Sequence, residues 1–238
     1  MRIEIWSDVV CPWCYIGKRR LESALERFEH ADEVEVVFRS FELDPSAPEV
    51  GTESVLESLS RKYGVGVAEA RQMMARVSRA ASAEGLDFDY DDATHTATVD
   101  AHRLLHLALD VGGAALQREL KEALLAAYFT RGESMGDRAV LRKLAVGVGL
   151  DSVAVEGVLD GTDYLDAVRA DIAQARAYGV TGVPFFVVDQ KYGIAGAQPA
   201  DVLSQVLETA WAESRPSLTM AASGAAEGDV CGPDGCAG

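Results

Sequence analysis

Two cysteines near the N-terminus carry the clearest chemical signal in the chain. Cys11 and Cys14 enclose a Pro-Trp dipeptide in the run CPWC. A thiolate is the nucleophile of disulfide exchange, and a second thiol close by can resolve the mixed disulfide that forms. We therefore expect Cys11 to be the exposed attacking sulfur and Cys14 to be the resolving one.

The position of this pair supports the redox interpretation. Residues 2–6 alternate in polarity as a strand does, and Leu21, Leu25 and Phe28 recur at helical spacing after Pro12. The pair therefore opens a helix, whose free N–H groups and dipole stabilise an anion. The alternative for such a pair is half of a structural zinc site. Its place between a strand and an amphipathic helix favours redox chemistry.

A proline far along the chain is the second signal. Pro184 stands at the head of a strand-like run, in the segment TGVPFF. It cannot donate to a sheet ladder and is a candidate for a cis bond; a trans proline that starts the strand is the alternative. Beside a dithiol, this loop would leave backbone groups free to pair with an extended chain. Trp13, Val183 and Phe185 are then the expected substrate contacts, with core packing as the alternative for the aromatic rings.

The other two cysteines lie in the C-terminal tail. Cys231 and Cys236 flank Gly-Pro-Asp-Gly, a turn sequence able to close a small disulfide. The segment 216–238 has the composition of a flexible tail, so we expect this pair to be a second redox couple that exchanges electrons with the N-terminal pair. An inert exposed pair and a zinc site shared by all four cysteines are the alternatives, and zinc would block the nucleophile.

Titratable side chains supply weaker candidates. Asp8, three residues before Cys11, is a candidate proton relay, with a solvated or helix-capping carboxylate as the alternative. His102 and His106 have the i, i+4 spacing of a metal-binding pair. The Glu of HExxH is missing between them, which favours an ordinary helix pair. We expect no metal.

The elements that position these residues fall into two parts around a helical block. Strand signals cover 2–6 and 33–41, on either side of the first helix, and a crossover this short predicts parallel strands. Strands at 183–188 and 192–195, and a helix from Pro199, follow much later. Between them lie segments with helical spacing, at 54–63, 67–84, 97–111, 114–129, 138–148 and 163–178.

The sheet can close only if these helices form an insertion. The predicted fold class is α/β, with βαβ and ββα parts separated by an all-α helical insertion domain. The predicted boundaries are an N-terminal sheet part at 1–44, the insertion at 45–178, a C-terminal sheet part at 179–215 and the tail at 216–238.

The composition is that of an ordinary globular chain. It has 238 residues, of which 48% are hydrophobic and 25% charged, and a chain of this length can bury a hydrophobic core. The formal charge of −16 is the opposite of what binding to nucleic acid needs. No apolar run approaches a membrane span, and the residues after Met1 lack the pattern of a signal peptide. We therefore expect a cytoplasmic protein without nucleic-acid or membrane partners, in which a cysteine pair is catalytic rather than structural.

The chain resembles the DsbA-like branch of the thioredoxin-fold oxidoreductases, most closely the FrnE type. The likeness rests on the segments SDVVCPWCYIG (7–17), DAHRL (100–104) and TGVPFFV (181–187). It implies a thioredoxin fold split by the insertion, with Cys11 as nucleophile, Cys14 as resolving thiol and cis-Pro184 facing them. It also implies protein dithiol–disulfide exchange or isomerisation without a metal or organic cofactor. The implied partners are protein or peptide thiols and disulfides, and a thiol reductant or oxidant.

Two other functions stay open at this point. Related kappa-class glutathione transferases and hydroxychromene carboxylate isomerases use glutathione or another thiol to act on a small aromatic substrate. They have Ser in place of Cys11 and a Ser-Asp or Asp-Arg pair in place of the segment 196–199 (GAQP), so both departures favour dithiol chemistry. A non-catalytic zinc-binding or redox-sensing module that uses the tail is the other alternative. The segment 100–104 receives no catalytic role, because Ala97 replaces the family's usual Asn.

Overall fold

The sheet is built from both ends of the globular part, in the strand order β2-β1-β3-β4. β1 (Arg2–Ser7) pairs in parallel with β2 (Glu35–Ser40), β3 (Phe185–Val188) lies antiparallel to β1, and β4 (Tyr192–Ala195) completes a hairpin. The computed structural model describes residues 1–90, 93–214, 231–232 and 235–236. The predicted parallel unit and the later hairpin are confirmed, and everything between β2 and β3 is inserted into the sheet.

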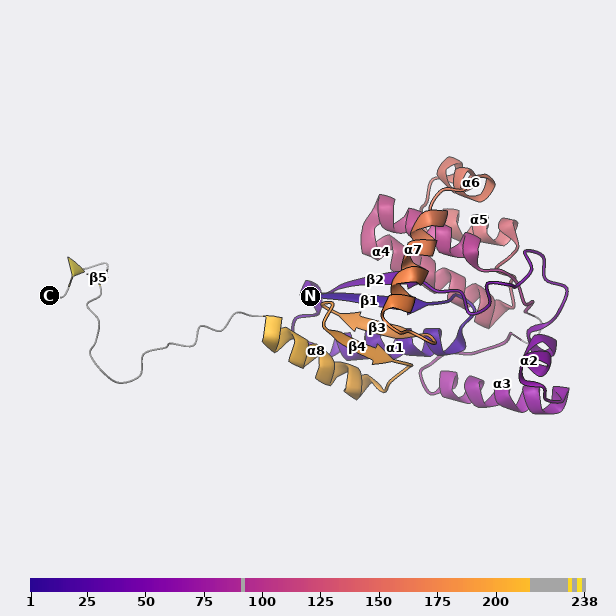
Figure 1. Cartoon of the computed structure of the whole chain (residues 1–238), viewed down its shortest axis with the longest axis horizontal. Coiled ribbons are helices and arrows are strands. Elements are labelled where there is room, and N and C mark those ends of the chain that lie inside the picture. The colour runs from indigo at the N-terminus through magenta and orange to yellow at the C-terminus, as the bar shows by residue number, and fades with distance from the viewer. Residues whose placement is uncertain (91–92, 215–230, 233–234, 237–238) are drawn as a thin grey trace.

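Apart from these four strands, the elements up to residue 214 are helical. They are α1 (Pro12–Glu26), the 3-10 helix η1 (Ala31–Glu33), α2 (Val55–Tyr63), α3 (Val67–Ser82), α4 (Val99–Arg131), α5 (Arg138–Gly147), α6 (Ser152–Asp160), α7 (Leu165–Ala177) and α8 (Ala200–Ser214). Helices α2 to α7 form the predicted insertion, and Figure 1 shows them beside and beyond the sheet. None of the described helices is long and apolar enough to cross a membrane.

Both faces of the sheet are covered. Ile5 of β1 packs with Leu21 of α1 and Leu207 of α8. Trp6 points to the opposite face and packs with Ala175 of α7. Figure 1 shows α7 crossing in front of the sheet and α1 behind it. Because β1 is a central strand buried on both sides, every residue after its first is buried, including the polar ones.

The helical block matches the predicted segments except for one added helix. The predicted helices 97–111 and 114–129 are both present; they are joined end to end as α4, which is kinked at Gly113, where φ is 68° and ψ is −168°. Glycine adopts these non-helical angles without a steric penalty, so the predicted break between the two helices lies at Gly113. The helix α6 was not predicted, and its first turn is capped by Asp151, whose side chain accepts a hydrogen bond from the amide of Ala154.

Helix α4 covers the free edge of the sheet. The backbone amide of Phe38 in β2 donates to Gln117 Oε1 at 2.8 Å, and the Gln117 side-chain amide donates to the Phe38 carbonyl at 2.9 Å. Gln117 thus takes the place that a neighbouring strand would occupy. The backbone groups of Phe38 at this strand edge are satisfied within the chain, and the two hydrogen bonds fix the position of α4 along β2.

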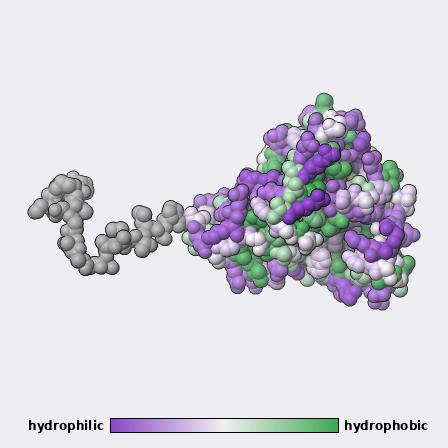
Figure 2. Space-filling model, in the orientation of Figure 1, coloured by the Kyte–Doolittle hydropathy of each residue, from purple (hydrophilic) through white to green (hydrophobic). Residues whose placement is uncertain are grey.

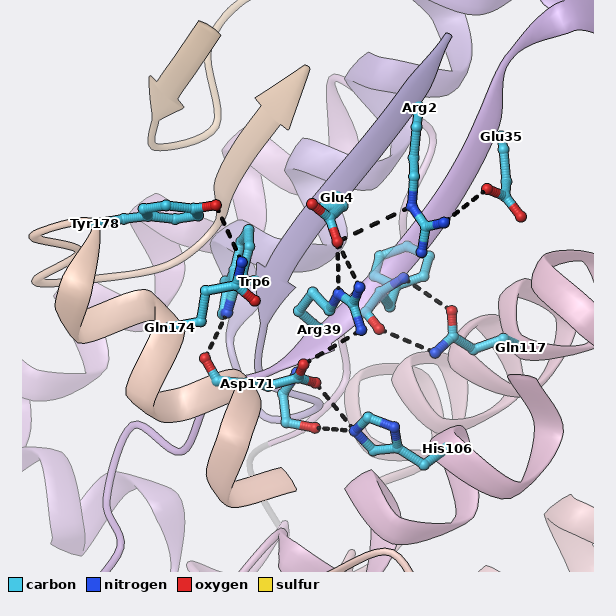
Figure 3. A network of polar contacts seen from close by, with 12 residues as sticks. Arg2, Glu4, Trp6, Glu35, Arg39, His106, Gln117, Asp171, Gln174 and Tyr178 are labelled. Atoms are coloured by element: carbon cyan, nitrogen blue, oxygen red, sulfur yellow. Dashed lines mark hydrogen bonds and ion pairs between the residues drawn. The ribbon is translucent and has the colours of Figure 1, made fainter. Parts of the chain in front are cut away.

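A buried polar network holds α7 against the same two strands. Figure 3 shows Arg39 of β2 lying between Glu4 of β1 and Asp171 of α7. His106 of α4 approaches Asp171 Oδ2 at 3.0 Å, and Trp6 donates to the Asp171 carbonyl at 2.8 Å. Because buried charges are costly unless paired, this network favours one placement of the insertion on the sheet.

The apolar core of the insertion extends to the cysteine motif. Val9, Tyr15 and Ile16, which flank the cysteines, belong to the same buried cluster as Leu104 and Phe129 of α4. The insertion therefore helps to fix the start of α1. Figure 2 shows the outside of the molecule, where polar side chains are interspersed with scattered apolar ones on the face in view.

Beyond α8 the structure describes two dipeptides. Cys231–Gly232 (β5) pairs antiparallel with Gly235–Cys236 (β6), and Cys231 stands opposite Cys236. The rest of the predicted flexible tail, 216–238, lies outside the described residues. The predicted domain boundaries at 44/45 and 178/179 stay predictions.

Candidate active site

The start of α1 holds both N-terminal thiols. Cys11 is the residue before the first helical position, with extended backbone (φ −94°, ψ 113°). The amides of Cys14 and Tyr15 donate to its carbonyl at 3.0 and 3.4 Å. Pro12 lacks an amide hydrogen, so its place in the first turn costs no hydrogen bond. Both cysteines are free thiols.

Cys11 is buried, which corrects the prediction of an exposed sulfur. Its exposed fraction is 4%, and that of Cys14 is 3%. The cause is the loop before β3, because the Cys11 thiol donates to the carbonyl of Val183, 3.5 Å from Sγ. Trp13, between the cysteines, is 41% exposed. The tryptophan therefore faces solvent at this motif, and access to Cys11 depends on the loop that covers it.

Cys14 is held as a thiol. Burial raises the pKa of Cys14 well above its usual range, and a hydrogen bond with Cys11 raises it further. The positive charge of Lys121 and a backbone hydrogen bond at Asp8 act in the opposite direction and are outweighed. A sulfur that keeps its proton is a poor first nucleophile, and this suits Cys14 to the second step of an exchange.

The Val183–Pro184 peptide bond is cis, as predicted. Pro184 is buried and comes close to α1 at Gly17. A Cβ on Gly17 would lie 3.0 Å from Pro184 Cγ and 3.3 Å from Phe186 Cζ. Side chains rarely pack so tightly, so a glycine at this position lets the loop lie directly on the helix. Gly17 is a site residue to which the sequence assigned no role.

The predicted substrate contacts differ in exposure. Val183 and Phe185 are half-buried, whereas Trp13 is exposed. The ring of Phe185 packs over Gly193 of β4, where a Cβ would lie 3.0 Å from Cζ, and against the cluster that contains Trp6. This packing favours the core alternative for Phe185. Of the three predicted contacts, the structure places the backbone of Val183 against Cys11, and Trp13 is exposed two residues along the chain.

Asp8 belongs to a buried polar cluster. It is 1% exposed, its Oδ1 accepts from the Val9 amide at 2.7 Å, and its Oδ2 accepts from the Leu43 amide at 2.8 Å. His102 Nε2 lies 3.2 Å from Oδ1. Burial alone would raise the pKa of Asp8, but the hydrogen bonds and the charge of His102 outweigh burial and bring that pKa below its usual value. Asp8 is an ionised buried carboxylate, and the solvated or helix-capping alternative is wrong.

The two histidines of α4 have separate partners. His102 faces Asp8, whereas His106 Nε2 lies 3.1 Å from Ser40 Oγ and 3.0 Å from Asp171 Oδ2. Within the described ranges, no three His, Cys, Asp or Glu side chains are placed to hold a metal ion. Sequence analysis assigned no catalytic role to the segment 100–104, yet its His102 contacts Asp8, which follows β1 and leads into the cysteines.

Asp8 also lines a hollow of about 100 Å³ between α2, the loop after β2 and the segment before α4. The wall includes Thr96 and Tyr128. Thr96 Oγ1 has no hydrogen-bond partner in the part of the chain that the structure describes. A hollow of this size has room for a few water molecules.

The tail cysteines are described by their backbone pairing alone. The side chains of Cys231 and Cys236 lie outside the description, so a second redox couple and its zinc alternative both stay predictions.

The model of the DSBA-like thioredoxin domain matches residues 2–208. The crystal structure of a probable DsbA oxidoreductase from Streptomyces coelicolor is 46% identical, with a TM-score of 0.85, and the match covers 100% of this chain and 98% of that one. YwbO of Bacillus subtilis, an uncharacterised protein, is 28% identical over 210 residues, 87% of this chain and 96% of its own. DsbM, a cytosolic disulfide reductase of Pseudomonas aeruginosa, shares the fold at 17% identity and a TM-score of 0.61, over 90% of this chain and 100% of that one.

These matches bear out the predicted family and the thioredoxin fold interrupted by a helical region. The FrnE subtype stays a prediction. The chain belongs to the DSBA-like thioredoxin family and is a thiol–disulfide oxidoreductase.

Proposed function

We propose that the chain exchanges disulfides with protein or peptide substrates through Cys11 and Cys14, beside cis-Pro184. One observation carries this proposal: the Cys11 sulfur, at the start of α1, lies 3.5 Å from the Val183 carbonyl that immediately precedes the cis bond. A loop held this close puts its backbone beside the nucleophile, where an extended substrate can pair with it.

The reaction proceeds in two exchanges. Cys11 loses its proton and attacks one sulfur of a substrate disulfide; a Cys11–substrate bond forms, and the other substrate sulfur leaves as a thiolate that takes up a proton. Cys14 then loses its proton and attacks Cys11, which closes the Cys11–Cys14 disulfide and releases the second substrate sulfur as a thiol. Two electrons pass from the cysteine pair to the substrate, and the reverse sequence oxidises a substrate dithiol.

The difference between the two sulfurs supports this order. Cys11 stands at the N-terminal, positive end of α1, where the helix dipole favours an anion, and its side chain makes no capping hydrogen bond. Cys14 keeps its proton because burial raises its pKa. Attack by Cys11 followed by resolution by Cys14 therefore matches the environment of each thiol.

Asp8 is assigned the proton relay for Cys14. Its backbone contacts Cys14, its carboxylate is ionised, and it lines the hollow of about 100 Å³ described above. A proton released when Cys14 attacks would pass to this carboxylate and then to water in the hollow. His102, 3.2 Å from Asp8 Oδ1, holds the carboxylate in place.

The proposed partners follow from this chemistry. Trp13 is 41% exposed and offers a polypeptide an apolar contact beside the nucleophile. A small-molecule thiol reductant or oxidant of the glutathione class returns the cysteine pair to its starting state. We place this cycle in the cytoplasm; cell fractionation checks that location.

Insulin reduction and refolding of scrambled ribonuclease test the proposal on the wild type and two variants. We expect Cys11→Ser to lose activity in both assays. Cys14→Ala should stop after one exchange as a mixed disulfide with its substrate. Multiple turnover by Cys14→Ala would overturn the proposal and show a one-thiol enzyme, such as a thiol-dependent isomerase or transferase.

The tail pair is tested separately. A double replacement of Cys231 and Cys236 by Ser should change either the turnover or the redox titration of the N-terminal pair. If both stay unchanged, the tail is no second redox couple. Metal analysis of protein purified under reducing conditions tests the zinc alternative on the same samples.

A further inference from the structure

Lys121 is a buried cation. Its exposed fraction is 1%, and its Nζ has no hydrogen-bond acceptor among the residues that the structure describes. The ring of Phe38 lies below the ammonium, 5.4 Å from Nζ to the centroid. An ammonium taken out of water is costly unless acceptors or an anion compensate for it. Burial accordingly lowers the pKa of Lys121 to about 8, a value at which most molecules still carry the charge at neutral pH.

The neighbours of Lys121 on α4 place it between the sheet and the active-site helix. Gln117, one turn earlier, binds the backbone of Phe38 at 2.8 and 2.9 Å. Glu122, the next residue, accepts a hydrogen bond from the hydroxyl of Tyr15 at 2.6 Å. Because Tyr15 directly follows the resolving cysteine, this turn of α4 lies against the first turn of α1.

The charged groups around Lys121 already have partners of their own. Lys18 of α1 is paired with Glu22 and with Glu122, each at 2.6 Å. The Asp8 carboxylate accepts two backbone amides and contacts His102.

The charge of Lys121 acts on the cysteine pair. It lowers the pKa of Cys14 and of Asp8, while Cys14, Asp8 and Cys11 favour the charged form of Lys121 and Lys18 opposes it. Since Asp8 is already hydrogen-bonded elsewhere, the anion still to form in this neighbourhood is a cysteine thiolate. Such a thiolate can form only in the reduced pair and is lost when the disulfide closes.

We propose that Lys121 is the charge partner of the Cys11–Cys14 pair and stabilises its reduced, thiolate-containing form over the disulfide. This inference rests on the proposed function. Lys121 has no hydrogen bond to either sulfur and transfers neither proton nor electron, so it is a positioning residue that acts through its charge. Without that charge the reduced pair is less favourable, and the protein becomes a stronger reductant.

Equilibration of the full-length chain with reduced and oxidised glutathione tests this inference. The oxidised fraction of the N-terminal pair is measured by mass spectrometry of the alkylated peptide that contains Cys11 and Cys14. The variants are Lys121→Met, of similar length and apolar, and Lys121→Gln, which is polar and neutral. Arg118→Met is the matched control, because it removes one positive charge from an exposed position on the same helix.

We expect the disulfide form to become about tenfold more favoured in Lys121→Met, a potential about 30 mV more negative. Lys121→Gln should shift in the same direction, and Arg118→Met should stay within about twofold of the wild type. Thiolate absorbance in the ultraviolet, measured in a Cys14→Ser background, should titrate at higher pH once the lysine is replaced. A merely structural role of Lys121 would change stability without moving either readout.

Two outcomes separate this inference from the proposed function. In the first outcome, the wild-type pair equilibrates with glutathione, and both Lys121 variants are folded by circular dichroism and have an equilibrium constant within about twofold of the wild type. The charge-partner role is then wrong, while the proposed function stands. If the wild-type pair exchanges no disulfide with glutathione or with insulin, the proposed function fails and this inference fails with it.

Discussion

Replacing Lys121 by Met should stabilise the folded protein at neutral pH. The pKa of this lysine falls from 10.5 to about 8 when the chain folds, because burial opposes its charge. Each tenfold loss of proton affinity corresponds to about 1.4 kcal/mol, so the charged side chain costs the folded state about 3 kcal/mol below pH 8. An apolar side chain of similar length removes this cost.

The pH dependence of this effect has a definite sign. Between about pH 8 and 10.5 the folded state binds fewer protons than the unfolded one, so the wild type gains stability as pH rises through that window. The advantage of Lys121→Met should therefore shrink from about 3 kcal/mol at pH 7 to about 1.4 kcal/mol near pH 9.5. Taking the difference between variant and wild type cancels the titration of the groups that Lys121 does not influence.

Urea unfolding of both proteins under reducing conditions at these two pH values measures that difference. A variant that is less stable than the wild type at pH 7 would contradict the reasoning. So would a difference that does not change with pH.

Three further predictions concern the packing around the site. Gly17→Ala should cost about 1–3 kcal/mol, because its Cβ would meet Pro184 Cγ at 3.0 Å, whereas Gly147→Ala, with no atom within 4 Å of the new Cβ, should leave thermal unfolding unchanged or slightly higher. Asp8→Asn should destabilise the protein at neutral pH. The pKa of Asp8 is lowered on folding, so the ionised carboxylate contributes stability above its usual pKa of 3.8, and this contribution is lost as the pH falls below 3.8. The difference in urea stability between variant and wild type should therefore close in acid. Arg103→Met should cost about 2–4 kcal/mol in the same assay, because its buried guanidinium binds three backbone carbonyls at the end of α6 and the loop after it; an unchanged midpoint would contradict this.

The parts of the fold that depend on neighbouring residues are readable from the sequence. The alternation in 2–6 gives β1, and a proline in the first turn followed by leucines at helical spacing gives α1. The cis bond at Pro184 follows from a proline that heads a strand after a glycine-containing loop. Each of these signals lies within a few residues of the feature that it predicts.

The helical block also follows local signals. The break between the predicted segments 97–111 and 114–129 coincides with Gly113, whose non-helical angles kink α4. Helix α6 lies outside the predicted segments, and Gly157 interrupts its apolar pattern. Asp151 at its start, a preferred capping residue, was the signal that would have found it.

The environment of the thiols depends instead on residues far apart in the chain. Val183, which covers Cys11, is 172 residues away in sequence, and His102 lies 94 residues from Asp8. No local pattern records such contacts, so the burial of Cys11 was missed. A buried lysine such as Lys121 carries no sequence signal, because lysine on a helix is normally solvated.

A trapping measurement tests the dithiol mechanism most directly. The Cys14→Ala variant is mixed with a peptide that contains a disulfide, the reaction is quenched in acid, and the bonded peptide is located by mass spectrometry after digestion. A peptide attached through a disulfide to Cys11, and no such adduct in a Cys11→Ser, Cys14→Ala double variant, is the predicted result. If Cys11 stays unmodified in the folded protein and the peptide disulfide stays intact, the dithiol mechanism is contradicted.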